Sequence, residues 1–201
     1  MTTAERIFNP KPTWIDLFPV PGHWTEADYY PLSDMGRIVE LSNGNVEVLP
    51  MPTIYHQLIL GRLFAALSAF ALQYKLGWVF FAPLPVRLWP GKVREPDLAF
   101  ISTPHAERMG TYLGVPDLVV EIISAGTEKT DREVKREEYA QAGIPEYWII
   151  DPKAKTLDLL RLDREAETYT TTAQLSLNDA LTSPTFPGFT LSLAELFAEA
   201  E

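Results

Sequence analysis

The segment Leu118-Val119-Val120-Glu121-Ile122-Ile123 is an almost continuous run of apolar residues that contains a single glutamate. Such a run is typical of a strand that is buried on both faces of a sheet, so it predicts an α/β fold built around this strand. A carboxylate inside a buried strand is costly unless it is paired or binds a metal ion. Glu121 therefore predicts a partner on a neighbouring strand.

Asp97 is the best candidate for this partner, because it begins the apolar segment 97–101. If the two strands pair antiparallel, the Cβ atoms of opposite residues lie about 5 Å apart. The two carboxylates can then share one hard cation, with a backbone carbonyl and water molecules completing an octahedral shell suited to Mg²⁺. Asp117 competes for this role because it shares a strand face with Glu121, but four residues of strand span roughly 13 Å. We interpret Asp117 as the residue at which the strand begins.

The rest of the chain alternates between helix and strand signals, which predicts an extended N-terminal arm over residues 1–24 and a single domain over residues 25–201. Asn43-Gly44 is a strong hairpin signal between strands at 37–41 and 46–49. Helices are predicted at 25–32, 56–76, 130–142 and 193–199. Further strands are predicted at 78–82, 86–88, 97–101, 118–123, 147–150, 155–162 and 168–175. Gly77 is expected to end the second helix, and Thr130 to cap the third in a capping box.

The composition restricts the class of protein. The chain of 201 residues is 46% hydrophobic and has no cysteine, which excludes disulfides and a Cys-ligated zinc site. The sequence shows no signal peptide and no stretch expected to span a membrane, so we expect a cytoplasmic protein without a membrane partner. The formal net charge of −10 counts against nonspecific coating of nucleic acid, which requires a strongly basic surface. It does not exclude a nuclease, whose metal-binding carboxylates themselves contribute negative charge.

One local basic cluster lies on the predicted third helix. Lys129, Arg132, Lys135 and Arg136 are spaced so that most of them share one side of that helix. This side is interpreted either as a surface that meets phosphate or as an ordinary solvated helix face.

Several motifs together indicate a family. Pro96-Asp97, followed by Glu121 on the next core strand, resembles the PD-(D/E)XK nuclease superfamily. The blocks PDLVVEIIS at 116–124 and GIPEYWIIDP at 143–152 resemble more closely the Uma-two family of small proteins related to restriction endonucleases. Between these blocks the resemblance includes Asp131, Lys135 and Tyr139, and it extends from about Glu40 to Phe186-Pro187-Gly188. It implies a restriction-endonuclease-like fold: a mixed central sheet flanked by helices, with an N-terminal β-hairpin.

The resemblance also implies a catalytic site. Carried onto this sequence, Asp97, Glu121 and the backbone carbonyl of Ile122 become ligands of Mg²⁺ or Mn²⁺. The superfamily's lysine would fall at position 123, where this chain has Ile123. Lys135 matches the place of the lysine in the Uma-two pattern and would orient the attacking water and offset charge on the phosphate. Without the resemblance, Lys135 would be interpreted as a surface lysine.

Three further positions match the family, and each of them also fits an ordinary structural role. Glu40 would reach the metal directly or through water, and is equally well interpreted as a carboxylate on the strand surface. His56 would position a phosphate or a metal-bound water, although a histidine near a helix N-terminus is more often a partly buried hydrogen-bonding residue. Asp131 is explained by the dipole of the helix that it begins, without a metal.

The sequence therefore predicts a metal-dependent endonuclease that hydrolyses phosphodiester bonds of DNA. Its expected partners are DNA and a divalent metal ion, and a homodimer is compatible with the cleavage of both strands. Two alternatives stay open. One is a noncatalytic nucleic-acid-binding or assembly module that keeps the nuclease fold, which the acidic charge and Ile123 favour. The other is a metal-dependent phosphohydrolase of small substrates, which needs no extended basic groove.

Overall fold

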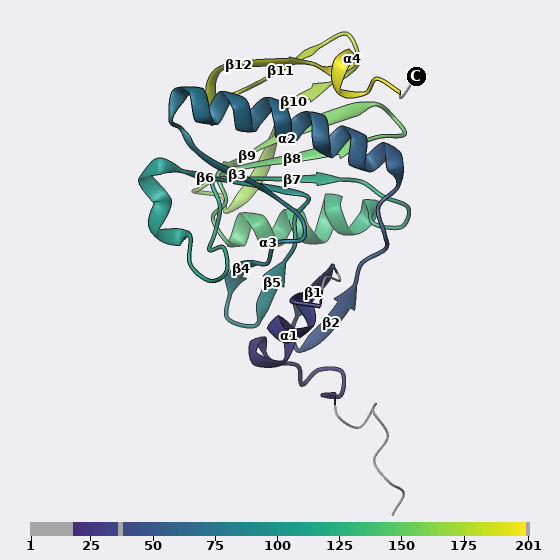
Figure 1. The fold of residues 1–201 in the computed structure, drawn as a ribbon, viewed down its shortest axis with the longest axis vertical. Coiled ribbons are helices and arrows are strands. Elements are labelled where there is room, and N and C mark those ends of the chain that lie inside the picture. Colours follow the sequence, from purple (N-terminus) through teal and green to yellow (C-terminus); the bar gives the residue numbers. More distant parts are fainter. Residues whose placement is uncertain (1–17, 36–37, 200–201) are drawn as a thin grey trace, which may run out of the picture.

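The computed structural model describes residues 18–35 and 38–199. Its centre is a six-stranded sheet in the order β10-β9-β8-β7-β6-β3 (Figure 1). The strands are β3 (Gly77–Phe81), β6 (Leu98–Ser102), β7 (Leu118–Ile122), β8 (Glu146–Asp151), β9 (Thr156–Asp163) and β10 (Thr168–Leu175). Strands β7 and β8 run parallel and the other neighbours antiparallel, so the sheet is mixed, as predicted.

Helices cover both faces of this sheet (Figure 1). They are α1 (Glu26–Ser33), α2 (Ile54–Tyr74), α3 (Lys135–Gln141) and α4 (Leu193–Leu196). Leu118 and Val120 of β7 belong to the core beneath α2, whereas Val119 belongs to the core against α3. Side chains on both faces of β7 are therefore buried, which explains its continuous apolar sequence. Because side chains alternate along a strand, Glu121 lies on the same face as Val119 and points toward α3.

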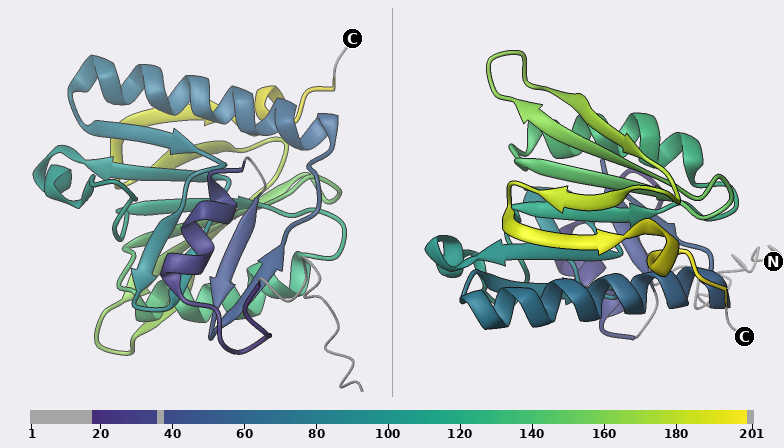
Figure 2. Two further views of the ribbon diagram at one scale, coloured as in Figure 1. Left: turned by 60° about the horizontal axis from the view of Figure 1, so that its bottom comes forward. Right: turned by 90° about the horizontal axis from the view of Figure 1, so that it is seen from above.

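A second, four-stranded sheet has the order β2-β1-β5-β4. Its strands are β1 (Val39–Ser42), β2 (Asn45–Val48), β4 (Val86–Trp89) and β5 (Lys92–Arg94). It lies with α1 at one end of the molecule, which Figure 2 shows turned toward the viewer. The predicted hairpin is present: Asn43 and Gly44 form its two-residue turn with φ of 51° and 74°, the left-handed conformation that such turns require.

The chain ends beside α2, over the same face of the six-stranded sheet (Figure 2). Strands β11 (Ala180–Ser183) and β12 (Phe186–Ser192) form a hairpin, and α4 follows it directly. Phe186, Phe189 and Leu193 from this region are buried with the inner face of α2. By length and composition alone α2 is apolar enough to cross a membrane, a test that the core helix of a soluble protein also passes.

Several local predictions were wrong. The third helix begins near Glu128, and Thr130 is the first residue of a π-helical turn, η3 (Thr130–Val134), so the predicted capping box at Thr130 does not form. Gly77 does not cap α2, because Lys75 takes the left-handed position with φ of 54°. A Cβ on Gly77 would lie 2.0 Å from the carbonyl oxygen of Ile101, so glycine is needed there for the close approach of β3 to β6.

The predicted set of elements was also incomplete at its ends. The last helix comprises Leu193–Leu196, shorter than the predicted 193–199. Strands β5, β11 and β12 were not predicted. Most of the predicted N-terminal arm, residues 1–17, and Arg37, the first residue of the predicted first hairpin strand, lie outside the described residues.

Candidate active site

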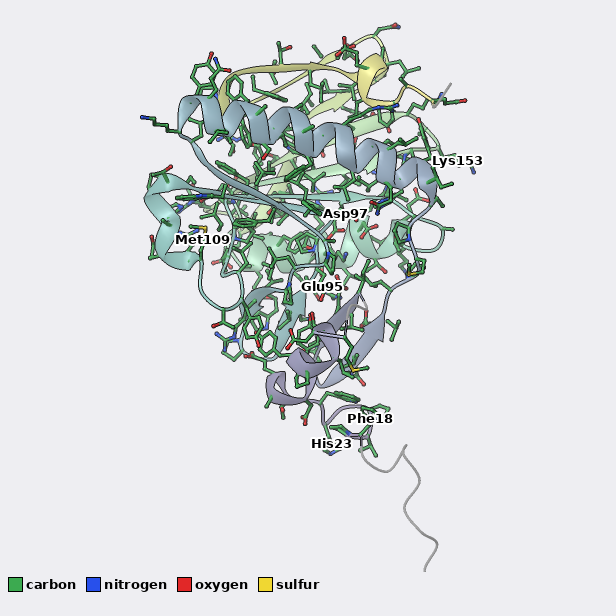
Figure 3. The ribbon with its side chains drawn as sticks, viewed as in Figure 1. Phe18, His23, Glu95, Asp97, Met109 and Lys153 are labelled. Atoms are coloured by element: carbon green, nitrogen blue, oxygen red, sulfur yellow. The ribbon has the colours of Figure 1, made fainter. Side chains whose placement is uncertain are left out.

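A cavity of about 290 Å³ lies where α2, β6, β7 and η3 meet. Asp97, Glu121, Lys135, Asp131 and His56 all contribute to its wall. Asp97 is labelled near the centre of the molecule in Figure 3, at the level of the six-stranded sheet. Four of the five residues predicted to be catalytic, all except Glu40, therefore line this cavity.

Asp97 and Glu121 reach the cavity from adjoining antiparallel strands. Leu98 of β6 is paired with Val120 of β7, so the same register continued by one residue places Asp97 opposite Glu121. Oδ2 of Asp97 accepts a hydrogen bond from the backbone N–H of Ile122 at 2.7 Å, which ties the two strand ends together. The two carboxylates therefore share one face and one cavity, as the antiparallel pairing predicted.

Lys135 is held among carboxylates and is only 4% exposed. Its Nζ lies 2.8 Å from Oε1 of Glu121, 3.2 Å from Oε1 of Glu40 and 3.5 Å from Oδ1 of Asp131. The hydroxyl of Tyr139 donates a 2.6 Å hydrogen bond to the same oxygen of Glu121. The π-helical turn η3 immediately precedes Lys135, and such turns are frequent at functional sites because they redirect side chains.

Glu40 is fully buried and reaches the cavity through Lys135. Its other oxygen accepts a 2.6 Å hydrogen bond from Arg94, and Arg94 also makes a two-pronged contact with Glu138 at 2.7 and 2.9 Å. The backbone N–H of Glu95 donates to Glu40 at 3.2 Å. In this arrangement Glu40 is an anchor for Lys135.

His56 stands beside Asp97 at the start of α2. Its Nε2 lies 3.2 Å from Oδ1 of Asp97. Its Nδ1 is buried and has no hydrogen-bond partner within the described part of the chain. This contact with Asp97 places His56 at the site, on the side of the cavity formed by α2.

Known proteins resemble this chain in both sequence and fold. The model of the Uma2 family, described as "Putative restriction endonuclease", matches residues 26–194. The chain belongs to the Uma2 family. A search of curated proteins found no match.

One solved structure resembles the Uma2 chain over most of its length. It is described as the crystal structure of "a putative nuclease belonging to DUF820" from Anabaena variabilis. The TM-score is 0.73 at 19% sequence identity, and the match covers 89% of this chain and 98% of the other. At this identity the likeness concerns the fold, and it confirms the predicted restriction-endonuclease-like architecture. The chain thus belongs to a family described as putative restriction endonucleases and shares the fold of this solved structure.

The electrostatics of the Uma2 site are dominated by buried negative charge. Burial, which Lys135 opposes and the carboxylates of Asp131, Asp97 and Glu40 reinforce, raises the pKa of Glu121 to about 8. Burial alone would lower the pKa of Lys135, but the surrounding carboxylates raise it well above its usual value. Lys135 is therefore a permanent cation near neutral pH, and its single charge does not balance its neighbours.

The structure corrects the interpretation of the basic cluster. Lys135 is buried in the site, and Arg132 forms a 2.6 Å ion pair with Asp158. Lys129 is exposed and lies 4.0 Å from Glu133. These residues do not form one free basic surface, because the helix presents them to different surroundings.

Sequence reasoning missed part of this Uma2 site. Asp131 was explained by the helix dipole, but its side chain is 3% exposed and lines the cavity. Glu95, buried and on the cavity wall, was not considered, although its spacing of two from Asp97 places both on one face of an extended chain. Arg94 gave no signal, because nothing local marks an arginine in a short strand as buried. Asp117, in contrast, lies at the other end of β7, where it accepts a hydrogen bond from Ser102 as expected of a strand-entry residue.

Proposed function

We propose that this Uma2 protein is a metal-dependent endonuclease that hydrolyses phosphodiester bonds of DNA. The observation that carries the proposal is that Asp97 and Glu121 line one cavity from adjoining strands, with the ammonium group of Lys135 against Glu121. The membership in a family of restriction-endonuclease type supports the reaction class.

The residues present fit a divalent metal ion. Among residues 18–35 and 38–199, no three His, Cys, Asp or Glu side chains form a ready-made metal site. The proposed ligands are two carboxylates, of Asp97 and Glu121, and the backbone carbonyl of Ile122, a set of hard oxygen donors that leaves positions for water, as Mg²⁺ and Mn²⁺ prefer. The raised pKa of Glu121 indicates that the buried carboxylates lack positive charge, which a dication would supply.

The chain's own groups have separate roles in the proposed reaction. A bound Mg²⁺ would polarise the phosphoryl oxygen and lower the pKa of a coordinated water. Lys135 stays protonated, so it stabilises developing negative charge and orients the attacking water without acting as the base. Glu40 and Asp131 hold the ammonium group in place, and His56 fixes the orientation of Asp97.

The direct test is nicking of supercoiled plasmid DNA by the purified protein with Mg²⁺ or Mn²⁺. Asp97→Asn and Glu121→Gln should each abolish nicking, and EDTA should abolish it in the wild type. Asp117→Asn is the matched control, because it removes the same charge at the far end of β7 and should nick normally. Unchanged nicking by folded Asp97→Asn and Glu121→Gln variants, checked by circular dichroism, would remove these residues from the mechanism.

A second candidate is a hydrolase of small phosphorylated substrates, which the net charge of −10 and the modest size of the cavity favour. Release of phosphate from mononucleotides without any cleavage of polymer would support it. DNA binding that persists in EDTA, without cleavage of any substrate, would instead support a noncatalytic module. A homodimer and a cytoplasmic location belong to the proposal and are tested by light scattering and by cell fractionation.

A further inference from the structure

The cavity extends beyond the proposed metal ligands to a largely apolar wall. This wall comes from the residue that precedes β1, from the end of β2 and from the linker that joins β2 to α2. Its apolar members are Ile38, Val48, Leu49, Pro50 and Pro52. At the same place Met51 is 86% exposed and Ile54 is 82% exposed, so the apolar character continues onto the surface. An apolar wall of this kind is unsuited to a phosphate group and suited to a flat, weakly hydrated one.

Glu95 supplies an unpaired polar group on this cavity. The residue is 2% exposed, and its Oε1 accepts hydrogen bonds from the hydroxyls of Tyr29 and Ser33, both at 2.9 Å. Its Oε2 is buried and has no partner within residues 18–35 and 38–199. Figure 3 labels Glu95 below Asp97, on the side of the four-stranded sheet. A buried carboxylate oxygen without a partner is costly, so this oxygen is available for a ligand.

The basic side chains indicate what kind of ligand can bind. Lys92, Arg94 and Lys135 are buried and paired with carboxylates. Arg87 and Arg132, nearer the surface, pair with Glu26 and Asp158. These five cations are therefore engaged within the protein. A grip on phosphates depends on free lysines and arginines, and none of these five is free to supply one at the cavity.

We propose that the cavity is a subsite for one unpaired nucleobase, whose polar edge hydrogen-bonds to Oε2 of Glu95. The inference rests on the proposed function, because it places a base of the nucleic-acid substrate beside Asp97 and Glu121. Val48, Pro50 and the other apolar residues of the wall contact the faces of the base, as apolar side chains do in enzymes that hold a base outside the helix. The volume of about 290 Å³ is at the lower end of the ~300–1,000 Å³ of pockets that hold small molecules. The substrate is thus single-stranded or locally unpaired DNA.

The test measures binding of the four deoxynucleosides, which carry no phosphate, to the intact protein by calorimetry in EDTA. The wild type should discriminate among the four bases. The isosteric Glu95→Gln should change the ratio between the affinities for the tightest-bound and the weakest-bound nucleoside by about tenfold, the size of one well-made base contact. Glu165→Gln removes the same charge from the exposed turn between β9 and β10 and should leave the ratio unchanged. Equal binding of all four deoxynucleosides, no binding, or an unchanged ratio in Glu95→Gln would each overturn the inference.

A second variant covers the case in which Glu95→Gln does not fold. Val48 is 64% exposed at the edge of the cavity, so Val48→Trp should fold normally and cover the opening, with a loss of nucleoside binding of at least about tenfold. Retained binding in Val48→Trp would contradict the subsite. The two proposals fail separately. Metal-dependent nicking without nucleoside discrimination removes the subsite and keeps the nuclease, whereas discrimination without nicking does the reverse.

Discussion

Replacement of Lys135 by methionine should strongly destabilise the fold. The ammonium group is 4% exposed and lies within 3.5 Å of oxygens of Glu121, Glu40 and Asp131. Removing one partner of a buried ion pair costs about 3–5 kcal/mol, because the remaining charges stay buried and unbalanced. The unfolding free energy of Lys135→Met, measured by urea denaturation at pH 7 without metal, should fall by this amount.

The matched control is Lys129→Met on the same helix. Lys129 is 82% exposed and its ion pair with Glu133 is 4.0 Å long, so the change should stay within about 0.5 kcal/mol. A loss below about 1 kcal/mol for Lys135→Met, no larger than that of the control, would contradict the role of Lys135 as a buried partner of these carboxylates. Lys135 would then be a surface lysine, as it is interpreted without the family resemblance.

Three other predictions use the same denaturation assay without metal. Stability should fall as the pH rises from about 5 to 8: the pKa of Glu121 is about 8 in the folded protein against 4.5 for a free glutamate, so the folded state binds the extra proton in this window. Glu121→Gln should reduce that slope, and an unchanged slope would contradict the assignment. Arg94→Met should cost about 3–5 kcal/mol by leaving Glu40 without one of its cations, and Arg94→Lys should restore only part of it because lysine lacks the planar fork. A full restoration by lysine would argue against the fork geometry. Gly77→Ala should lower the free energy of unfolding by about 2 kcal/mol or more, because the new Cβ would lie 2.0 Å from a carbonyl oxygen of β6. Gly61→Ala, on the open side of α2, should not destabilise the protein. Equal effects of the two changes would count against the packing of β3 on β6.

The part of the fold that follows from periodicity was predictable from the sequence. The apolar run around Glu121, the hairpin turn at Asn43-Gly44 and the helical spacing of apolar residues in α2 are all local patterns, and each is present. The local sequence around Gly77 indicates a helix cap. Its true role, a close contact with β6, involves residues distant in sequence and therefore leaves no local signal. The π-helical turn before Lys135 likewise depends on the surroundings of the helix, which no local capping pattern records.

In the candidate site, the sequence predicted the residues that belong to a motif. It did not predict the residues that only hold other site residues in place. Asp97 and Glu121 were found because a carboxylate in an apolar strand is conspicuous. Glu95 was accessible to the same alternation argument, since it is two residues from Asp97. Arg94 was not accessible, because its two-pronged contact with Glu138 joins a strand and a helix that only the tertiary fold brings together.

The proposed nuclease activity depends on Asp97 and Glu121 holding one divalent cation together. The most direct measurement is an anomalous difference map from a crystal of the protein soaked in Mn²⁺. We expect one strong peak that both carboxylates and the carbonyl oxygen of Ile122 coordinate, at about 2.0–2.2 Å, and loss of that peak in Glu121→Gln. A Mn²⁺-saturated crystal with no peak between these two carboxylates, or with a peak bound elsewhere, would contradict it.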